Sequence, residues 1–406
     1  MHRHALDSRE TIIETCRLSK SHVQLGVALP GNVYDEHGTM LLSKGQVLDS
    51  DAQLTALLER GMYVEIGVFN AQFRQASAAP EPRTVEHKFD PFLVRETMKP
   101  GLNRLLRGVI DASATPEQVL EFATHVRDFA EADPEAAIAA CLLDRHEELR
   151  AVAHSLNSAI LCTLLAKRLE WPDARQNSVI CAALTMNLGM LDVQPRLSRQ
   201  ATPLTPVQHE QINAHPEAAM AALRQIAVAD PAWLAAVHQH HEKPEGKGYP
   251  QQVPQPSEES QLIRLTDTFL ARAASRADRP PLPPSQIIKH LFVEDGQGPF
   301  AALVASMVKL LGLYPPGCFV KLANGEIAVV FRNEASQKTP IVAAVTTTSG
   351  IPTMQPVRRD TEREQFAISG TVTPDKVSLG YDLGKLWVTN AKPGAKTNGN
   401  GEASQT

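Results

Sequence analysis

The stretch of sequence with the clearest chemical potential is HHEKPEGKGYP, residues 240–250. His240 and His241 are adjacent, and neutral imidazole is the commonest side-chain metal ligand in proteins. They lead directly into a glycine-containing loop that carries Lys243 and Lys247, two cations suited to phosphate. Metal ligands beside a cationic loop suit the metal-assisted hydrolysis of a phosphodiester. A metal centre of this kind needs further ligands from elsewhere in the chain.

Three more ligand-type residues lie in apolar surroundings with helical periodicity. His154 is in AVAHSLNSAILCTLLAK, His215 precedes Pro216, and Asp267 is in LIRLTDTFLA. Helical geometry is disfavoured for a residue that precedes a proline. We therefore expect the chain to be non-helical at His215, just before a new helix. Helices of one bundle can direct such side chains into a single inward-facing site. A lone histidine on an apolar helix face is usually a core residue, so spacing alone leaves both interpretations open.

Length and composition indicate a globular, mainly helical protein of two or three domains. Its 406 residues are more than a single hydrophobic core usually accommodates. Of these residues, 43% are hydrophobic, 21% charged and only 5% aromatic. The formal net charge of −5 gives no basic field for a nucleic-acid polymer. Five scattered cysteines without a CxxC pair indicate structural thiols in a reducing compartment. The sequence begins without an apolar signal region, and no apolar run approaches the ~18 residues of a membrane span, so we expect a cytoplasmic location.

The periodicity of the sequence predicts a mainly α fold class with two smaller β-rich regions. We expect the following segments: an N-terminal segment at 1–21, a small β-rich module at 22–70, a linker at 71–91, a helical domain at 92–312, a C-terminal β extension at 313–390 and a disordered tail at 391–406. In the β-rich module, Ser50 and Gly61 are expected to cap a helix at its two ends. Asn324-Gly325, between two alternating stretches, predicts a hairpin.

Over about residues 144–331, the sequence resembles the HD-GYP family of bacterial phosphodiesterases that open cyclic di-GMP. The matching segments follow the family's order: AHSLNSAI, LTMNLGM, LTPVQHEQINAHPEAA, HHEKPEGKGYP, LIRLTDTFLARAASRADRPP and LGLYPPGCFVKLANGEIAVV. The module at 22–70 also resembles the small domain often placed ahead of such phosphodiesterases. The resemblance implies a helical HD-type bundle. It also implies that the family's iron or manganese ligands correspond to His154, His215, His240, His241 and Asp267. In the same way, the segment expected to flank the substrate pocket is Gly248, Tyr249 and Pro250, with Lys243 and Lys247 as candidates to contact phosphate.

The sequence departs from the family at the centre of the expected metal site. The family's His-Asp pair and the lysine that follows it correspond here to Met186, Asn187 and Met190. A carboxylate that bridges two metal ions offsets their mutual repulsion, whereas an amide is neutral and a thioether is a soft ligand, poorly matched to iron(II) or manganese(II). The nearest acid is Asp192, which has no histidine beside it. We therefore expect a reduced site that holds at most one iron or manganese ion, without catalytic residues at these three positions.

Three functions are compatible with such a chain. We favour a degenerate HD-GYP protein of cyclic di-GMP signalling, which binds the nucleotide or other signalling proteins without hydrolysing the nucleotide, because binding does not require activated water. The alternative is a working phosphodiesterase with a reduced metal site, in which a metal-bound hydroxide relies on the remaining ligands. The third is a scaffold that binds neither metal nor nucleotide and keeps its helices for partner docking.

Overall fold

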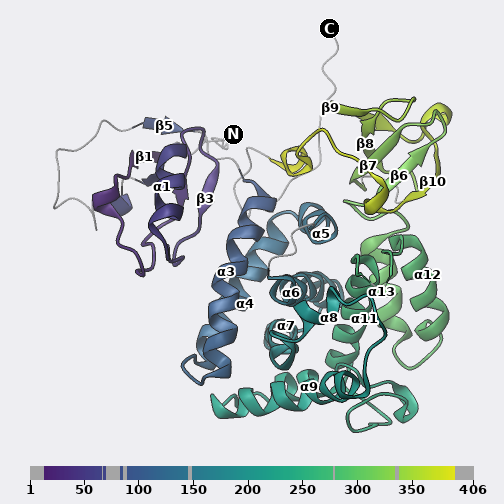
Figure 1. Cartoon of the computed structure of the whole chain (residues 1–406). Coiled ribbons are helices and arrows are strands. Elements are labelled where there is room, and N and C mark those ends of the chain that lie inside the picture. Colours follow the sequence, from purple (N-terminus) through teal and green to yellow (C-terminus); the bar gives the residue numbers. More distant parts are fainter. Residues whose placement is uncertain are drawn as a thin grey trace, which may run out of the picture. The chain divides into compact units, whose positions relative to one another are not determined.

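The computed structural model describes residues 13–65, 67–69, 83–85, 89–144, 149–277, 279–333 and 338–388. The chain forms two compact units, which divide after Thr97 and again after Trp387. Their elements are labelled in chain order in Figure 1. Most of the expected linker at 71–91 and the whole of the expected tail at 391–406 lie outside the described residues.

The first unit is an antiparallel sheet with helix α1 against its apolar residues. Its strand order is β3-β2-β4-β1-β5. The element bounds are β1 Ile13–Arg17, η1 Lys20–His22, β2 Val33–Tyr34, β3 Met40–Leu42, α1 Asp51–Arg60, β4 Tyr63–Glu65 and β5 Arg83–Val85. As expected, Ser50 caps α1 by accepting a hydrogen bond from the amide of Gln53, and Gly61 ends the helix at a positive φ of 82°. Strands β1 and β5 lie outside the range 22–70, because pairing with β4 and with each other brings in chain on both sides of that range.

The second unit is a helical bundle followed by a β-sheet. Helix α3 (Pro91–Ile110) begins in the first unit and ends in the second. The remaining helices are α4 Pro116–Ala132, α5 Pro134–Leu142, α6 Arg150–Arg168, α7 Asp173–Thr185, η2 Leu188–Met190, α8 Gln194–Ser198, α9 Pro206–Gln225, α10 Pro231–Gln239, η3 Pro244–Gly246, α11 Glu258–Ala273, α12 Pro284–Asp295 and α13 Ala301–Leu311. Prolines occupy the first turns of α4, α5, α9 and α10, where the missing N–H costs nothing.

Helix α6 is the centre of the bundle. Its sequence is apolar nearly all round, and almost every residue from Ala151 to Ala166 is buried. Such a helix can only be accommodated with neighbours on all sides. It packs against α4, α5, α7, α11 and α13, which surround it in Figure 1. This central position allows a polar side chain on α6, such as that of His154, to meet side chains from other helices.

The C-terminal sheet packs next to the bundle within the second unit. Its order is β10-β6-β7-β8-β9, with bounds β6 Phe319–Leu322, β7 Ile327–Arg332, β8 Ile341–Thr346, β9 Pro352–Asp360 and β10 Ile368–Val372. Short 3-10 helices follow or interrupt these strands: η4 Glu364–Phe366, η5 Pro374–Lys376 and η6 Leu383–Trp387. Arg332 at the end of β7 forms two hydrogen bonds of 2.6 Å to the carboxylate of Asp133, which caps α5. This forked ion pair joins the sheet to the bundle.

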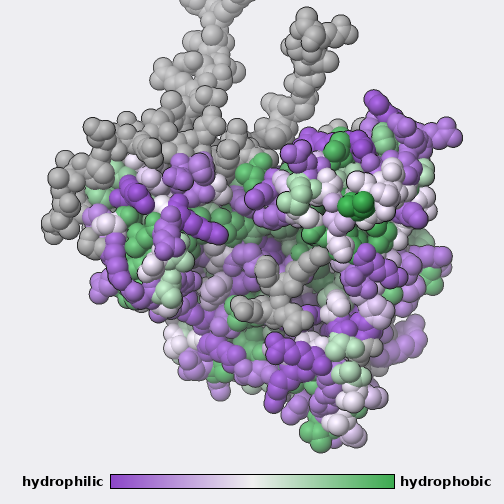
Figure 2. Space-filling view, turned by 45° about the horizontal axis from the view of Figure 1, so that its top comes forward, coloured by the Kyte–Doolittle hydropathy of each residue, from purple (hydrophilic) through white to green (hydrophobic). Residues whose placement is uncertain are grey.

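The structure confirms the expected fold class, mainly α with a small β-rich N-terminal module and a short C-terminal β region. The hairpin predicted around Asn324-Gly325 is also confirmed, since β6 and β7 pair antiparallel on either side of it. Among the described residues, no helix combines the length and the apolar character needed to cross a membrane. The cytoplasmic location stays a prediction. On the face drawn in Figure 2, hydrophilic residues predominate and hydrophobic ones show in small patches between them.

Candidate metal centre

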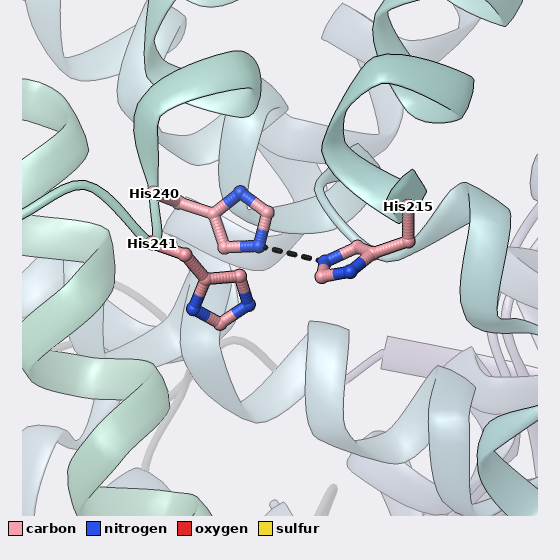
Figure 3. Close-up of side chains that lie close together, drawn as sticks. All are labelled: His215, His240 and His241. Carbon is pink, nitrogen blue, oxygen red and sulfur yellow. Dashed lines mark hydrogen bonds between the residues drawn. The ribbon is translucent and has the colours of Figure 1, made fainter. Parts of the chain in front are cut away.

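Three imidazoles converge where two helices meet. His215 lies within α9, His240 is the C-cap residue of α10, and His241 follows it. Their ligand atoms all lie within 4.8 Å of one another, and Nε2 of His215 is 3.0 Å from Nε2 of His240. Figure 3 shows the three rings facing one another from the two helices. The bundle therefore gathers three of the five side chains expected to bind metal.

A proline inside α9 holds the ring of His215. The expectation that the chain is non-helical at His215 is wrong, because α9 runs through both His215 and Pro216. Pro216 has no N–H, so it cannot donate to the carbonyl of Ile212, four residues earlier. That carbonyl instead accepts a hydrogen bond from Nδ1 of His215. The imidazole replaces the missing helical hydrogen bond, and its Nε2 is left with a lone pair that faces the site.

The ring of His240 is held in the same way at the end of α10. The carbonyl of Val237, in the last turn of the helix, accepts a hydrogen bond of 2.6 Å from Nδ1 of His240. Burial lowers the pKa of His215 to about 4, and burial also lowers the pKa values of His240 and His241. All three rings are therefore neutral near pH 7. The two Nε2 lone pairs then face each other at 3.0 Å, an arrangement that a shared cation stabilises.

The spacing of His215 and His240 suits two ligands of one metal ion. Two nitrogen ligands about 2.1 Å from an ion lie ~3.0 Å apart at a right angle and ~3.4 Å apart in a tetrahedron. The observed separation of 3.0 Å between Nε2 of His215 and Nε2 of His240 agrees with the shorter of these two distances. The donor set is three neutral nitrogens, which suits a divalent transition metal better than the oxygen-seeking magnesium or calcium.

The other two expected ligands, His154 and Asp267, pair with each other. Nε2 of His154 on α6 lies 2.7 Å from Oδ1 of Asp267 on α11. Burial alone would raise the pKa of Asp267, but the hydrogen bond with His154 and the nearby histidines hold this pKa well below its usual range. Asp267 therefore carries a negative charge beside the three imidazoles, with one of its oxygens already engaged.

All these groups except His240 line one cavity of about 470 Å³. Its polar lining includes His154, His215, His241, Tyr249 and Asp267. A second cavity, of about 580 Å³, shares five lining residues with it: Arg150, His154, Ser198, Ala274 and Arg276. The two hollows are therefore adjacent, with His154 and two arginines between them. Their volumes are typical of small-molecule sites.

The stretch of chain that carries this cavity is similar in sequence to known proteins. Residues 138–299 match the HD domain family. Over this stretch the chain resembles HD domains. A curated relative, cyclic di-GMP phosphodiesterase PA4108 of Pseudomonas aeruginosa, is 26% identical over 181 residues, which cover 44% of this chain and 43% of that protein. Among solved structures, Bd1817, an HDG"Y"P protein from Bdellovibrio bacteriovorus, is 14% identical with a TM-score of 0.46, covering 73% of this chain and 99% of its own. The resemblance to HD-GYP proteins that the motifs indicated is confirmed at the level of this domain.

Within this HD-like stretch, the glycine-containing loop supports the ring of His241. Tyr249 stacks on His241 with ring centroids 4.7 Å apart and an interplanar angle of 24°, and its amide donates to the carbonyl of His241 at 3.3 Å. Gly248 makes this return possible, because a Cβ there would lie 2.4 Å from both the Cα of Glu242 and the amide nitrogen of Lys243. The peptide bond between Tyr249 and Pro250 is cis. Of this expected pocket segment, Tyr249 is the member that lines the cavity.

The two loop lysines do not line this cavity. Lys243 is exposed at the start of η3, and Lys247 is exposed and pairs with Glu245. In the part of the chain that the structure describes, neither lysine is among the residues that line the histidine cavity. Arg150 and Arg276 are its lining cations instead. Sequence reasoning missed them because they are distant in sequence and meet only through α6 and the end of α11.

The positions corresponding to the family's His-Asp pair have contrasting surroundings. Met186 is fully buried and is not among the described residues that line the cavity, whereas Asn187, 6% exposed, and Met190 both line it. Gly189 lies against α9, where a Cβ would be 3.0 Å from the carbonyl oxygen of His215. This close approach brings Asn187 and His215 to the same cavity. Position 187 therefore belongs to the site, and position 186 belongs to the core.

Asp192 provides no substitute for the lost acid. It forms a two-pronged ion pair with Arg107, with distances of 2.6 and 2.9 Å, at the surface. The pKa of Asp192 is lowered chiefly by this hydrogen bonding. In the described structure it is not a lining residue of the histidine cavity.

Sequence reasoning also missed Glu242, the third residue of the HHE triplet. This fully buried carboxylate accepts hydrogen bonds from the amides of Gln251 at 2.6 Å and Val253 at 3.1 Å. It ties the end of the loop back to its start, and so holds Tyr249 over His241. A glutamate directly after two histidines and before a loop with two glycines was the available signal, since an irregular loop must satisfy its backbone groups somehow.

Proposed function

We propose that the HD domain binds cyclic di-GMP beside the three imidazoles and hydrolyses it poorly or not at all. In this proposal the protein is a nucleotide sensor or an interaction module for other signalling proteins. The observation that carries it is the charge of the cavity lining beside the triad: the neutral imidazoles of His215 and His241, the neutral amide of Asn187, and Asp267 as the one carboxylate among the described lining residues. The nucleotide itself is suggested by the relative named a cyclic di-GMP phosphodiesterase.

Chemistry explains why this lining favours binding over hydrolysis. Opening a phosphodiester requires a nucleophilic hydroxide at neutral pH, which metal centres make by lowering the pKa of bound water. Two metal ions held close together need bridging negative charge to offset their repulsion. Asn187 brings none, and one oxygen of Asp267 is already bonded to His154. The site therefore lacks the charge that a two-metal centre requires.

One metal ion is compatible with the residues present. His215, His240 and His241 would hold it, and iron or manganese is the expected element from the resemblance. When bound, such an ion would polarise a phosphoryl oxygen and help to orient the nucleotide. The protein's own residues contribute the fixed tautomers of His215 and His240 and the stacking of Tyr249 on His241.

A second function has support from the same triad. Three histidines with an open position are the ligand set of some single-metal catalytic centres that activate water. The alternative proposal is therefore an active phosphodiesterase with a reduced metal site, in which Asp267 and His154 serve as the proton-transfer pair next to the ion. Both proposals place the nucleotide in the same cavity, and they differ in turnover.

One set of measurements separates these functions. Purified full-length protein is analysed for metal content, titrated calorimetrically with cyclic di-GMP, and incubated with cyclic di-GMP and added Mn²⁺. We expect at most one tightly held ion per chain, heat of nucleotide binding, and no multiple turnover. Brisk turnover supports the alternative, and absence of binding at high micromolar nucleotide leaves the scaffold.

A matched pair of variants connects the result to the triad. His215→Ala removes one imidazole from the site, whereas His209→Ala removes an exposed imidazole from the same helix. We expect metal content to fall in the first variant alone. Equal metal content in both would contradict the assignment of the triad as the metal centre. Urea denaturation in a chelator checks that both variants are folded.

A further inference from the structure

Two neutral carboxamides in the cavity have unused hydrogen-bonding capacity. Asn187 and Gln194 both line it, and they lie on one segment that runs from the end of α7 into α8. Nδ2 of Asn187 and Oε1 of Gln194 are buried without a hydrogen-bond partner in the described part of the chain. Buried polar atoms are nearly always paired in native proteins, and leaving one unpaired costs about 1–3 kcal/mol. Two such groups beside one cavity indicate a ligand that completes them.

The chemistry of a carboxamide restricts what that ligand is. Each carboxamide offers both a donor and an acceptor and carries no charge. An ionised phosphodiester presents acceptors alone, so it leaves the carboxamide oxygen unpaired. A purine base presents donors and acceptors side by side along its edge, which is why asparagine and glutamine pair with bases in nucleic-acid recognition. The carboxamides therefore match the base of a nucleotide rather than its phosphate.

Other lining residues match the remaining parts of a nucleotide. Arg150, which donates a hydrogen bond of 2.7 Å to the carbonyl of Ser275, and Arg276 bring positive charge to the same cavity. Apolar side chains of Leu197, Leu204 and Ile212 provide the surface that a flat base requires. Cation, apolar wall and carboxamides are thus present together.

We propose that Asn187 and Gln194 are specificity-determining residues that hydrogen-bond to the edge of a purine base in this cavity. The proposal rests on the proposed function, since it takes guanine of cyclic di-GMP as that base. In this assignment the side chain of Asn187 contacts the nucleotide directly, and it also lacks the negative charge of the acid that the family has at this position. The replacement thereby exchanges a metal-bridging group for a base-recognising one.

The test compares near-isosteric apolar variants in calorimetric titrations. Full-length protein, as purified and without chelator, is titrated with cyclic di-GMP and, separately, with pyrophosphate, which has phosphate charge and no base. Asn187→Leu and Gln194→Met keep side-chain size and remove hydrogen bonding, and Gln211→Met is the matched change at an exposed position on α9. We expect each cavity variant to bind cyclic di-GMP about 10-fold more weakly, with pyrophosphate binding unchanged. Gln211→Met should match wild type for both probes.

Each contrary outcome has its own meaning. If wild type binds cyclic di-GMP and both cavity variants bind it equally well, the base contact is refuted while the proposed function stands. If the variants weaken cyclic di-GMP and pyrophosphate equally, the carboxamides do not read a base and the proposal fails. If wild type binds no cyclic di-GMP, the proposed function fails together with the proposal. Asn187→Ala and Gln194→Ala replace any variant that does not fold by circular dichroism.

Discussion

Pro216 offers a test in which helix stability and metal affinity change in opposite directions. Pro216→Ala gives the helix back an amide N–H, which can donate to the carbonyl of Ile212 in the regular α-helical pattern. That carbonyl is the present partner of Nδ1 of His215. The regained N–H and the imidazole then compete for one oxygen, and the ring loses the contact that fixes its tautomer and direction.

The magnitudes follow from the two hydrogen bonds. A regained backbone hydrogen bond in α9 should raise the free energy of unfolding by about 1 kcal/mol in chelator. Loss of the partner that orients a metal-binding histidine typically weakens metal binding 10- to 100-fold. We therefore expect Mn²⁺ affinity to fall about 10-fold, equivalent to ~1.4 kcal/mol, in a protein that is slightly more stable.

The assay pairs chelator competition for Mn²⁺ affinity with urea denaturation of the metal-free protein. Pro100→Ala is the matched control, because Pro100 also lies inside a helix, α3, where no expected metal ligand depends on it. This control should resemble wild type in metal affinity. Unchanged Mn²⁺ affinity in Pro216→Ala would refute the role of the proline in orienting His215.

Three further predictions concern the loop, the lost acid and acid stability. Glu242→Gln removes one of two backbone-accepting oxygens, so we expect about 2 kcal/mol lower unfolding free energy and faster hydrogen exchange at the two loop amides; protection as in wild type would contradict this role. Asn187→Asp should raise Mn²⁺ affinity at least 10-fold in calorimetry, because it adds negative charge beside the triad. Met186→His should lower the free energy of unfolding by about 1–3 kcal/mol in a thermal melt, because it buries an imidazole in the core. If the two variants change metal affinity and stability alike, the different placement of the two positions is wrong. In chelator, the free energy of unfolding should fall by about 3 kcal/mol from pH 7 to pH 4. The reason is that His215 binds a proton near pH 6.5 in the unfolded chain, whereas in the native protein its pKa is about 4. Denaturation curves with equal midpoints across this range would refute the prediction.

Much of the fold was predictable because it depends on local patterns. Helix caps such as Ser50 and the turn at Asn324-Gly325 act within a few residues, and the structure has both as expected. The apolar, helical periodicity around His154 likewise indicated a helix, which is α6. Strands β1 and β5 were not placed in the first sheet, because their pairing joins residues about 70 apart and no local signal marks it.

Helical geometry at His215 was not predictable from the local rule about prolines. The rule counts the hydrogen bond that Pro216 removes and does not count a replacement. Here the imidazole of His215 supplies that replacement, and packing of α9 against α10 supports the continuous helix. The hydrogen bonds of Glu242 were likewise not predicted, since they join its side chain to backbone amides nine and eleven residues further along the chain.

The sequence by itself determined the chemical inventory of this protein: the histidines, the aspartate, and an amide and thioethers where the related family has acid, imidazole and lysine. Only the tertiary structure decided how these groups combine. It gathers His215, His240 and His241, pairs His154 with Asp267, and sends Asn187 to the cavity but Met186 to the core. The reason is that residue types are carried along the chain, whereas the direction of each side chain depends on how its helix is rotated and packed against its neighbours.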